Sequence, residues 1–585
     1  MTITPDIVAS ALRKILQPRM RWLGLIVSSC LLLWYLLSQF SETWHLPFLN
    51  EDYAFMELAR RSSFLEIWTA AELRVGPWFR PWSQGGHFWL VHSLFGTRVM
   101  LWHAVSIGLV LSTLVAYFEF VRRAAGLQVG GVATSCVAGL VAWGLLISWT
   151  SGVQDLWMIL FSLLSLHAAT RRRMSWASVA MMGALLSKET AAVLPAIATA
   201  WFAFVDRLPW RAAARETGKM WGALLLWVAL YSLAMWHSPP PQAGTETAAP
   251  SVWNAVVMSG TALLSAVNLD AAPQPTVGWM RACGLAILGA IPLLGLFSWA
   301  TACGRVPQVG GETAALGPTR PEAVGHVGLV RFGVAWAILG WLPLLVPSLK
   351  WHSYYGIFGC LGAWLAMSIP LASRPRLSTC VIIGLLVLRA GRSTTEIHDW
   401  GEESYVRRAG GFVNMLRSDL LVKCPKPRPH TRFYFTDVPS EVGFLVGDGP
   451  SLRIWYNDST LTGYFWRNFR VRGARQPAGD DRFFRYDSVG GWFEVLPGLP
   501  ESALTYSPTP RWIQDHTRLA QAFVSGEDWR AAHKQFAILA ENCPESSSFA
   551  YLAGLSALAD GDTASAHRWQ LRATRPSLLP SDIGP

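Results

Sequence analysis

The chain has 585 residues, of which 52% are hydrophobic and only 15% are charged, and it contains 31 tryptophans. A soluble protein of this length needs a larger charged surface, so the composition excludes an ordinary soluble fold and favours a membrane protein. The net charge of +11 is accounted for by basic clusters at the ends of membrane spans, so no nucleic-acid partner is needed to explain it.

Long apolar runs recur through the first two thirds of the chain. A helix that crosses the hydrocarbon layer needs about 20 apolar residues, and the sequence predicts about eleven spans, give or take one or two because short runs can tilt or merge. The predicted spans lie near residues 20–40, 98–120, 131–148, 154–170, 174–188, 190–206, 219–236, 279–302, 329–348, 355–372 and 377–391. The first run is too long for a cleaved signal and is expected to remain as a membrane anchor.

Basic clusters at alternate connections predict the orientation of these spans. They comprise Arg122–Arg123, Arg171–Arg173, Arg207–Lys219, Arg305–Arg320 and Arg374–Arg376. The positive-inside rule places all of them in the cytoplasm, with the N-terminus inside and everything after Arg392 outside. We therefore expect an integral protein of a bacterial inner membrane with a periplasmic C-terminal region.

Two outer loops have character of their own. The first, roughly 41–97, ends in an apolar segment from Gln84 to Phe95 that is too short to cross easily and is predicted to be an interfacial helix. The second, 237–278, opens with a Pro-rich linker and continues as an apolar stretch expected at the outer surface. Residues 1–392 are thus predicted to form one membrane module.

The exported region divides into two further parts. Residues 393–505 predict an amphipathic helix followed by β-like runs at 432–438, 451–458 and 481–487. Residues 506–585 match helix–turn–helix repeats of the tetratricopeptide type, expected to pack on the β-rich part or to bind a protein partner. The predicted fold class is therefore mainly α, a polytopic membrane protein with an α+β region ending in repeat-like helices. Whether Cys424 and Cys543 form a disulfide is left open.

A small set of polar side chains is expected at the outer membrane face. It comprises Glu51, Asp52, Arg80, Asp155, Lys188, Glu189, Lys350, His352, Tyr354 and Tyr355. Charges at this depth are costly unless they are paired or face water, so they are candidates for function. Carboxylates suit proton transfer or a cation, and basic side chains suit a phosphate.

Each of these residues also has a structural reading. Glu51 and Asp52 suit the N-terminus of the following helix, and Lys188 and Glu189 suit an ion pair at a helix turn. Arg80 can anchor the chain at the lipid headgroups, and His352 can be an ordinary histidine at the membrane interface. Asp155 can simply begin a helix.

The layout resembles the polytopic glycosyltransferases of the GT-C fold. An acidic pair follows the first span, an Arg-Pro motif and an interfacial helix occupy the first outer loop, and LSKETAAVLP at 186–195 is similar to the Ser-Lys-Glu segment of the transmembrane and tetratricopeptide-repeat O-mannosyltransferases and their bacterial relatives. The late outer loop of that family carries a Glu-Arg-Tyr-type motif, where this chain has LKWHSYYG at 349–356.

The resemblance implies a role for each matched position. Asp52, with Glu51, serves the acceptor as base or orienting acid, or holds a divalent metal if one is used. Arg80, Lys188 and the loop containing Lys350, His352, Tyr354 and Tyr355 contact the phosphate of a polyprenyl-phosphate sugar donor, and Glu189 steadies Lys188. The implied reaction is sugar transfer at the extracytoplasmic face, with inversion, to a lipid, polysaccharide or protein acceptor. No cofactor is assigned.

Two alternatives from other classes are kept. A transporter or flippase of a lipid-linked or anionic solute predicts charged residues at mid-membrane depth and paired broken helices. A non-catalytic scaffold predicts that function depends on the repeat-like tail and not on Asp52 or Lys188.

Overall fold

The computed structural model describes residues 43–69, 78–236, 252–270, 326–345, 351–393, 403–438, 449–497 and 509–574. Its contacts divide the chain into two units. The membrane unit comprises Met1–Phe48 and Leu58–Gly410, and the C-terminal unit comprises Leu49–Glu57 and Gly411–Pro585. Each unit is described by itself below.

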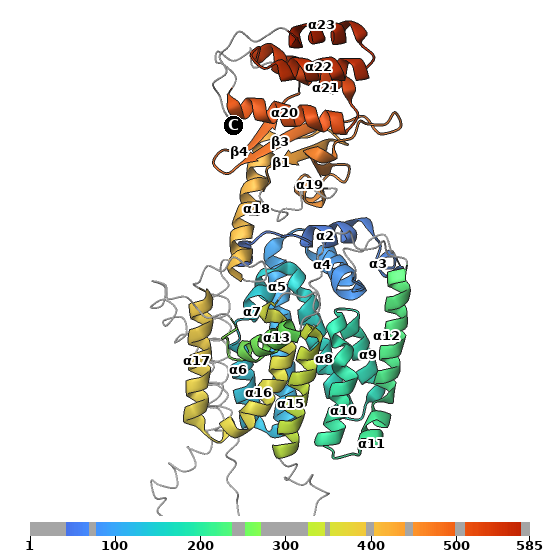
Figure 1. The fold of residues 1–585 in the computed structure, drawn as a ribbon. Helices are drawn as coiled ribbons and strands as arrows, with labels where there is room; N and C mark the ends of the chain where they lie inside the picture. The colour runs from blue at the N-terminus through green and yellow to red at the C-terminus, as the bar shows by residue number, and fades with distance from the viewer. Residues whose placement is uncertain are drawn as a thin grey trace, which may run out of the picture. The chain divides into compact units, whose positions relative to one another are not determined.

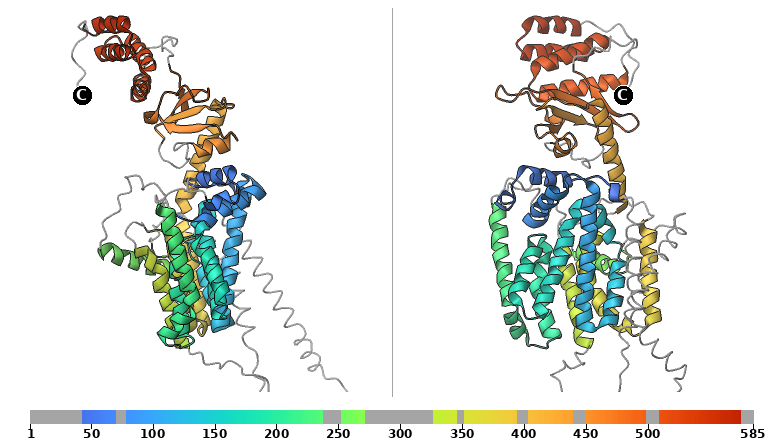
Figure 2. Two further views of the ribbon diagram at one scale, coloured as in Figure 1. Left: turned by 90° about the vertical axis from the view of Figure 1, so that its right-hand side faces the viewer. Right: turned by 180° about the vertical axis from the view of Figure 1, so that it is seen from behind.

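The membrane unit consists of helices, and its long helices run alongside one another in both views of Figure 2. In chain order the described elements are η1 (Thr43–His45), α3 (Glu66–Thr69), η3 (Pro81–Gly86), α4 (His87–Phe95), α5 (Val99–Ala125), α6 (Leu127–Ala138), α7 (Trp143–Ser148), η4 (Thr150–Gly152), α8 (Val153–Thr170), α9 (Met174–Leu185), η5 (Glu189–Val193), α10 (Leu194–Phe204), α11 (Trp210–Glu216), α12 (Gly218–Trp236), α13 (Val252–Ser265), α15 (His326–Trp341), η6 (Leu342–Leu345), η7 (Ser353–Gly356), α16 (Ile357–Ala372) and α17 (Pro375–Ser393) (Figure 1).

Five helical segments of the described residues are long and apolar enough to cross a membrane: Val99–Ala125, Thr150–Thr170, Gly218–Trp236, His326–Leu345 and Ser353–Ala372. They match five of the predicted spans. The mainly α, polytopic membrane architecture is therefore confirmed, and the chain is an integral membrane protein. The predicted spans near 20–40 and 279–302 lie outside the described residues.

The predicted span 131–148 is wrong as a single helix, because the structure divides it into α6 and α7. The buried side chain of Asn268 fills the break: its Oδ1 accepts a hydrogen bond from the backbone of Val141 and its Nδ2 donates to the carbonyl of Gly139, each at 2.9 Å. An amide supplied from elsewhere in the fold can satisfy backbone groups that a continuous helix would pair internally. A helix is present at 84–95 as expected, as the end of η3 and all of α4, and its interfacial position stays a prediction.

The C-terminal unit contains a small sheet between helices. Its described elements are α2 (Asp52–Arg61, as far as Glu57), α18 (Glu403–Lys423, from Gly411 on), β1 (Arg432–Thr436), α19 (Pro450–Trp455), β2 (Thr462–Phe465), η9 (Trp466–Asn468), β3 (Asp481–Asp487), β4 (Gly491–Val495), α20 (Pro510–Ser525), α21 (Trp529–Asn542), α22 (Ser547–Ala559) and α23 (Thr563–Ala573). The strand order is β2-β1-β3-β4. β1 pairs in parallel with β2 and β3, and β3 pairs antiparallel with β4.

Alternation along β1 places aromatic side chains on both faces of this sheet. Phe433 and Phe435 pack with Leu416 and Leu420 of α18, whereas Tyr434 packs with residues of α20 on the other face. In Figure 1 the strands accordingly lie between α18 and α20. Of the C-terminal helices, α20 therefore packs on the sheet, as expected.

The strand prediction was right for β1 and β3 and wrong for 451–458, where the structure has helix α19. Pro450 occupies the first helical position, and Gly449 before it is left-handed, with φ +69°. Both features favour a helix start over a strand. Consecutive helices among the four from Pro510 to Ala573 pack against one another, and their identity as tetratricopeptide repeats stays a prediction. Cys424 and Cys543 are both buried.

Candidate functional site

Four charged side chains come together in the membrane unit from three separate segments. Arg80 immediately precedes η3, Asp155 lies in the first turn of α8, and Lys188 and Glu189 lie where α9 passes into η5. We call these four residues the charged cluster. The sequence predicted Arg80, Lys188 and Glu189 for one site, and the structure places them together.

Lys188 is held by Asp155. Its Nζ donates hydrogen bonds to both carboxylate oxygens of Asp155, each at 2.7 Å, and each side chain is only 7% exposed. The expectation that Glu189 steadies Lys188 is therefore corrected. Lys188 is in an extended conformation, with φ −162° and ψ 136°, and adjacent side chains diverge from such a backbone.

Glu189 instead holds Arg80. The Nε and Nη2 atoms of Arg80 donate to the two carboxylate oxygens of Glu189 at 2.8 and 2.5 Å. This two-point arrangement fixes the plane of the guanidinium as well as its position. A third bond, from Nη1 to Oε1 of Gln154 at 2.7 Å, links Arg80 to α8, and the guanidinium lies 4.8 Å from the Trp78 ring.

Two hydrogen bonds to backbone carbonyls join these segments. The amide of Trp82 donates to the carbonyl of Leu186 at 3.1 Å, and Oγ of Ser83 donates to the carbonyl of Ser187 at 2.7 Å. Both bonds join the Arg-Pro loop to the Ser-Lys-Glu turn. Two short motifs that are more than a hundred residues apart in the chain are thus joined directly by hydrogen bonds.

The segment at 351–356, which contains η7, brings aromatic rings to the cluster. Nζ of Lys188 lies 4.7 Å from the ring of Tyr355 and 5.4 Å from that of Tyr354, distances at which a cation is attracted to an aromatic face. His352 is buried and stacks on Tyr354 at 5.9 Å. The predicted loop residues therefore contact the cluster through tyrosine. Lys350 lies outside the described residues.

The cations of the cluster keep hydrogen-bonding capacity beyond their carboxylate partners. A lysine carries three N–H donors and an arginine five. Among the described residues, Asp155 takes two donors of Lys188, while Glu189 and Gln154 together take three of Arg80. These contacts leave one N–H of Lys188 and two of Arg80 unused. Burial works against the guanidinium charge, but the Glu189 carboxylate outweighs it and raises the pKa of Arg80.

Glu51 and Asp52 belong to the C-terminal unit. Asp52 begins α2, is 1% exposed, and its Oδ2 accepts the backbone N–H of Leu49 at 2.9 Å. This is the helix-start role that the sequence offered as a structural reading. Within the same unit α2 is attached to α19, because Arg453 forms a buried ion pair with Glu57 at 2.9 Å.

The sequence favoured a helix-start role for Asp155 and gave no signal for Gln154. Both have direct contacts in the cluster. The available signal was position along the chain. Asp155 lies at the start of one predicted span and Lys188 at the end of another, and the predicted topology puts these two span ends on the same side of the membrane. Among the described residues, no group of three or more His, Cys, Asp or Glu side chains is arranged to hold a metal ion.

Comparisons with known proteins give two matches among solved structures. One is ArnT from Cupriavidus metallidurans bound to undecaprenyl phosphate, with 15% identity, a TM-score of 0.36, and coverage of 75% of this chain and 85% of that chain. The other is the same protein in the apo state, with 16% identity, a TM-score of 0.37, and coverage of 81% and 94%. No family model and no curated protein matches the chain.

Matches at this level of similarity do not define an activity for this chain. The activity is therefore inferred from its own residues.

Proposed function

We propose that the chain is a membrane glycosyltransferase that takes a sugar from a polyprenyl-phosphate donor at the extracytoplasmic face. The observation that carries the proposal is the charged cluster. It holds an arginine and a lysine in fixed positions, compensates their burial with carboxylates, and leaves N–H donors for a phosphate. A buried cation without such compensation would be costly to maintain.

The proposed reaction is a single displacement. An acceptor hydroxyl attacks the anomeric carbon, the bond from that carbon to the phosphate oxygen breaks, and the oxygen leaves with the electron pair as polyprenyl phosphate. The remaining N–H groups of Arg80 and Lys188 bind the phosphate and stabilise the charge that grows on it in the transition state. Attack opposite to the leaving phosphate inverts the anomeric centre.

Asp52 is proposed as the base that takes the acceptor proton, with Glu51 beside it. Tyr354, Tyr355 and His352 are proposed to shape the phosphate side, together with Lys350. Asp155 and Glu189 are positioning residues, because they act through Lys188 and Arg80. The acceptor is a lipid, a polysaccharide or a protein, and the C-terminal helices offer a surface for a protein partner.

The test is binding and transfer with the purified full chain. Native mass spectrometry measures retention of undecaprenyl phosphate, and a labelled undecaprenyl-phosphate sugar measures transfer. We expect Lys188→Gln to lower both by about tenfold or more, because a charge-assisted bond to phosphate is lost. Lys426→Gln removes the same charge at an exposed position of the C-terminal unit, outside the cluster, and serves as the control.

Unchanged binding and transfer in Lys188→Gln would overturn the role of the cluster. Loss of binding with transport of an intact lipid-linked sugar, and no transfer, would support the transporter alternative. The scaffold alternative would be supported if both single variants kept the function of the protein in cells and removal of residues 510–585 abolished it.

A further inference from the structure

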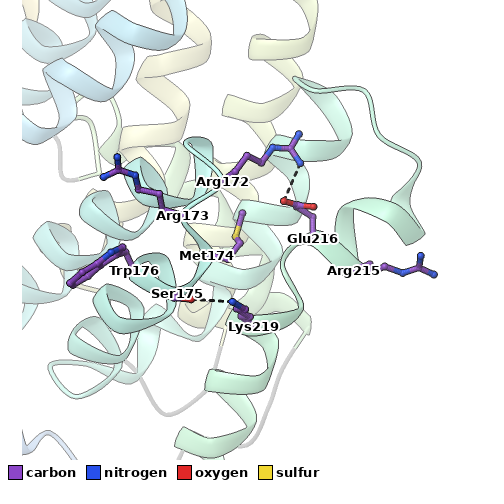
Figure 3. A pocket seen from close by; sticks show the side chains of 8 residues that line it. All are labelled: Arg172, Arg173, Met174, Ser175, Trp176, Arg215, Glu216 and Lys219. Atoms are coloured by element: carbon purple, nitrogen blue, oxygen red, sulfur yellow. Dashed lines mark hydrogen bonds and ion pairs between the residues drawn. The ribbon is translucent and has the colours of Figure 1, made fainter.

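A second group of cations lies at the other end of α8 and α9. The described structure contains a cavity of about 590 Å³ there, lined by Arg172, Arg173, Met174, Ser175, Trp176, Arg215, Glu216 and Lys219 (Figure 3). We call it the basic pocket. Asp155 is near the start of α8 and Arg172 follows its end, and 18 residues of helix separate the two groups by about 27 Å.

One cation of the pocket is structural. Arg172 forms ion pairs with Asp206 at 2.7 Å and with Glu216 at 3.1 Å, and its guanidinium lies 4.5 Å from the Phe202 ring. Its φ of +61° falls in the left-handed region, which lets the chain reverse between α8 and α9 in three residues. Arg172 therefore fixes the pocket wall and is not available to a ligand.

The other cations are not neutralised in this way. The side chains of Arg173, Arg215 and Lys219 are exposed and form no ion pair within the described part of the chain. Lys219 donates a hydrogen bond to Oγ of Ser175 at 3.1 Å, which joins α12 to α9 across the pocket (Figure 3). Three uncompensated positive charges around one cavity create a local attraction for an anion.

The flank of the pocket is apolar. Trp176, in the pocket wall, is 68% exposed, and Val179 continues the exposed apolar face of α9 at 63%. Leu225 and Leu226 continue that of α12, with 70% and 56% exposed. Large apolar side chains left exposed on packed helices of a membrane protein face acyl chains.

We infer that the basic pocket binds the phosphate of an anionic membrane phospholipid, whose acyl chains lie along the exposed faces of α9 and α12. The phosphate chemistry alone would also suit a soluble phosphate. The adjoining apolar face favours the lipid, because a soluble anion has no acyl chains to contact it. The basic clusters predict that this end is cytoplasmic, so the lipid belongs to the inner leaflet.

The inference is tested on the purified full chain by native mass spectrometry. The probes are phosphatidylglycerol, phosphatidylcholine with the same acyl chains, and inorganic phosphate. We expect bound phosphatidylglycerol to fall by about tenfold in the double variant Arg173→Gln/Lys219→Gln, because each basic residue near an anionic surface contributes to attraction. The variant Arg374→Gln/Arg376→Gln removes two exposed charges that do not line the pocket. It should change binding less than about twofold, because salt screens exposed charges beyond about 8 Å.

Three results would overturn the inference. They are equal losses in both double variants, binding of phosphatidylcholine as strong as that of phosphatidylglycerol, and displacement of the lipid by inorganic phosphate at equal concentration. The last would assign the pocket to a soluble phosphate. If Arg173→Gln/Lys219→Gln does not elute as a single species, Arg173→Gln/Arg215→Gln replaces it, and Lys219→Arg should retain binding.

Discussion

The two ends of α8 and α9 carry similar residue types in opposite arrangements. In the charged cluster the side chains of Lys188 and Arg80 are only 7% and 11% exposed, and each is matched by a carboxylate. In the basic pocket most cations are exposed and unmatched. A buried charge must be paired to be tolerated, whereas a surface charge costs little on its own.

The difference separates two ways of handling an anionic headgroup. The cluster fixes its donors before a ligand arrives, and preorganised donors are what transition-state stabilisation requires. The pocket has long, exposed side chains that must be ordered on binding, and ordering them costs side-chain entropy. The first arrangement suits chemistry on a phosphate, and the second suits retention of a lipid.

The largest expected effect comes from breaking the buried pair. In Lys188→Met the carboxylate of Asp155 is left buried without its partner, and we expect a loss of about 3–5 kcal/mol of stability. Thermal unfolding of the purified chain measures this loss. Restoring neutrality in Lys188→Met/Asp155→Leu should recover most of the stability, because a well-packed apolar pair can replace a buried ion pair.

The same double variant separates structure from function. It should fold like the parent and still fail to retain undecaprenyl phosphate, since the donor on Lys188 is gone. Recovery of lipid binding along with stability would show that Lys188 is only structural.

The second prediction tests whether a buried ion pair contributes as much to stability in the C-terminal unit. Arg453 and Glu57 are 4% and 8% exposed, and Nε1 of Trp455 donates to Oη of Tyr53 at 3.1 Å. In Arg453→Gln we expect about 3 kcal/mol of lost local stability, because Glu57 is left buried without its cation. Hydrogen exchange in segments 49–57 and 449–456 of the full chain measures it.

Trp455→Phe is the matched, milder change. It keeps a ring beside Tyr53 and removes one hydrogen bond, so it should cost about 1 kcal/mol. Protection that is unchanged in Arg453→Gln would contradict the attachment of α2 to α19 through this pair.

The third effect concerns geometry at constant charge. Arg80→Lys keeps a cation beside Glu189 but cannot reproduce the two-point contact and the bond to Gln154. We expect affinity for undecaprenyl phosphate to fall by about tenfold, roughly the value of one charge-assisted hydrogen bond. A titration followed by native mass spectrometry measures it, with Arg98→Lys as the control on a solvent-facing arginine. Equal affinities of Arg80→Lys and the parent would show that charge alone matters at this position.

The sequence was sufficient for the five long spans and for three of the four members of the cluster, but not for Asp155 or for the pairing. Hydropathy over about 20 residues identifies a span, because the bilayer imposes that length. Which carboxylate meets Lys188 depends on which loops adjoin after folding. The nearest carboxylate along the chain, Glu189, projects elsewhere because Lys188 is extended, and Asp155 arrives from another helix.

The misassigned elements have equally local causes. The strand predicted at 451–458 follows its β-branched and aromatic content, whereas Pro450 and a left-handed Gly449 start a helix there. The break between α6 and α7 is stabilised by Asn268, more than a hundred residues away in the chain. No pattern within 131–148 encodes that contact.

The smallest expected effect is on protein stability, from a change to one exposed cation of the basic pocket. Arg173 is exposed and has no ion-pair partner in the described part of the chain, so Arg173→Gln should change the stability of the lipid-free protein by less than about 0.5 kcal/mol. In the presence of phosphatidylglycerol the parent should gain thermal stability and the variant should gain less, because a ligand stabilises only the state that binds it. Thermal unfolding with and without the lipid measures both values.

Salt provides the final contrast. Exposed charges are screened within about 8 Å at physiological ionic strength, whereas buried pairs are screened much less. Raising the salt concentration should therefore abolish the stabilisation by phosphatidylglycerol and leave the cost of Lys188→Met nearly unchanged. A cost of Lys188→Met that falls with salt as steeply as the lipid effect would mean that the charged cluster is open to water, and the distinction between its fixed donors and the mobile ones of the basic pocket would not hold.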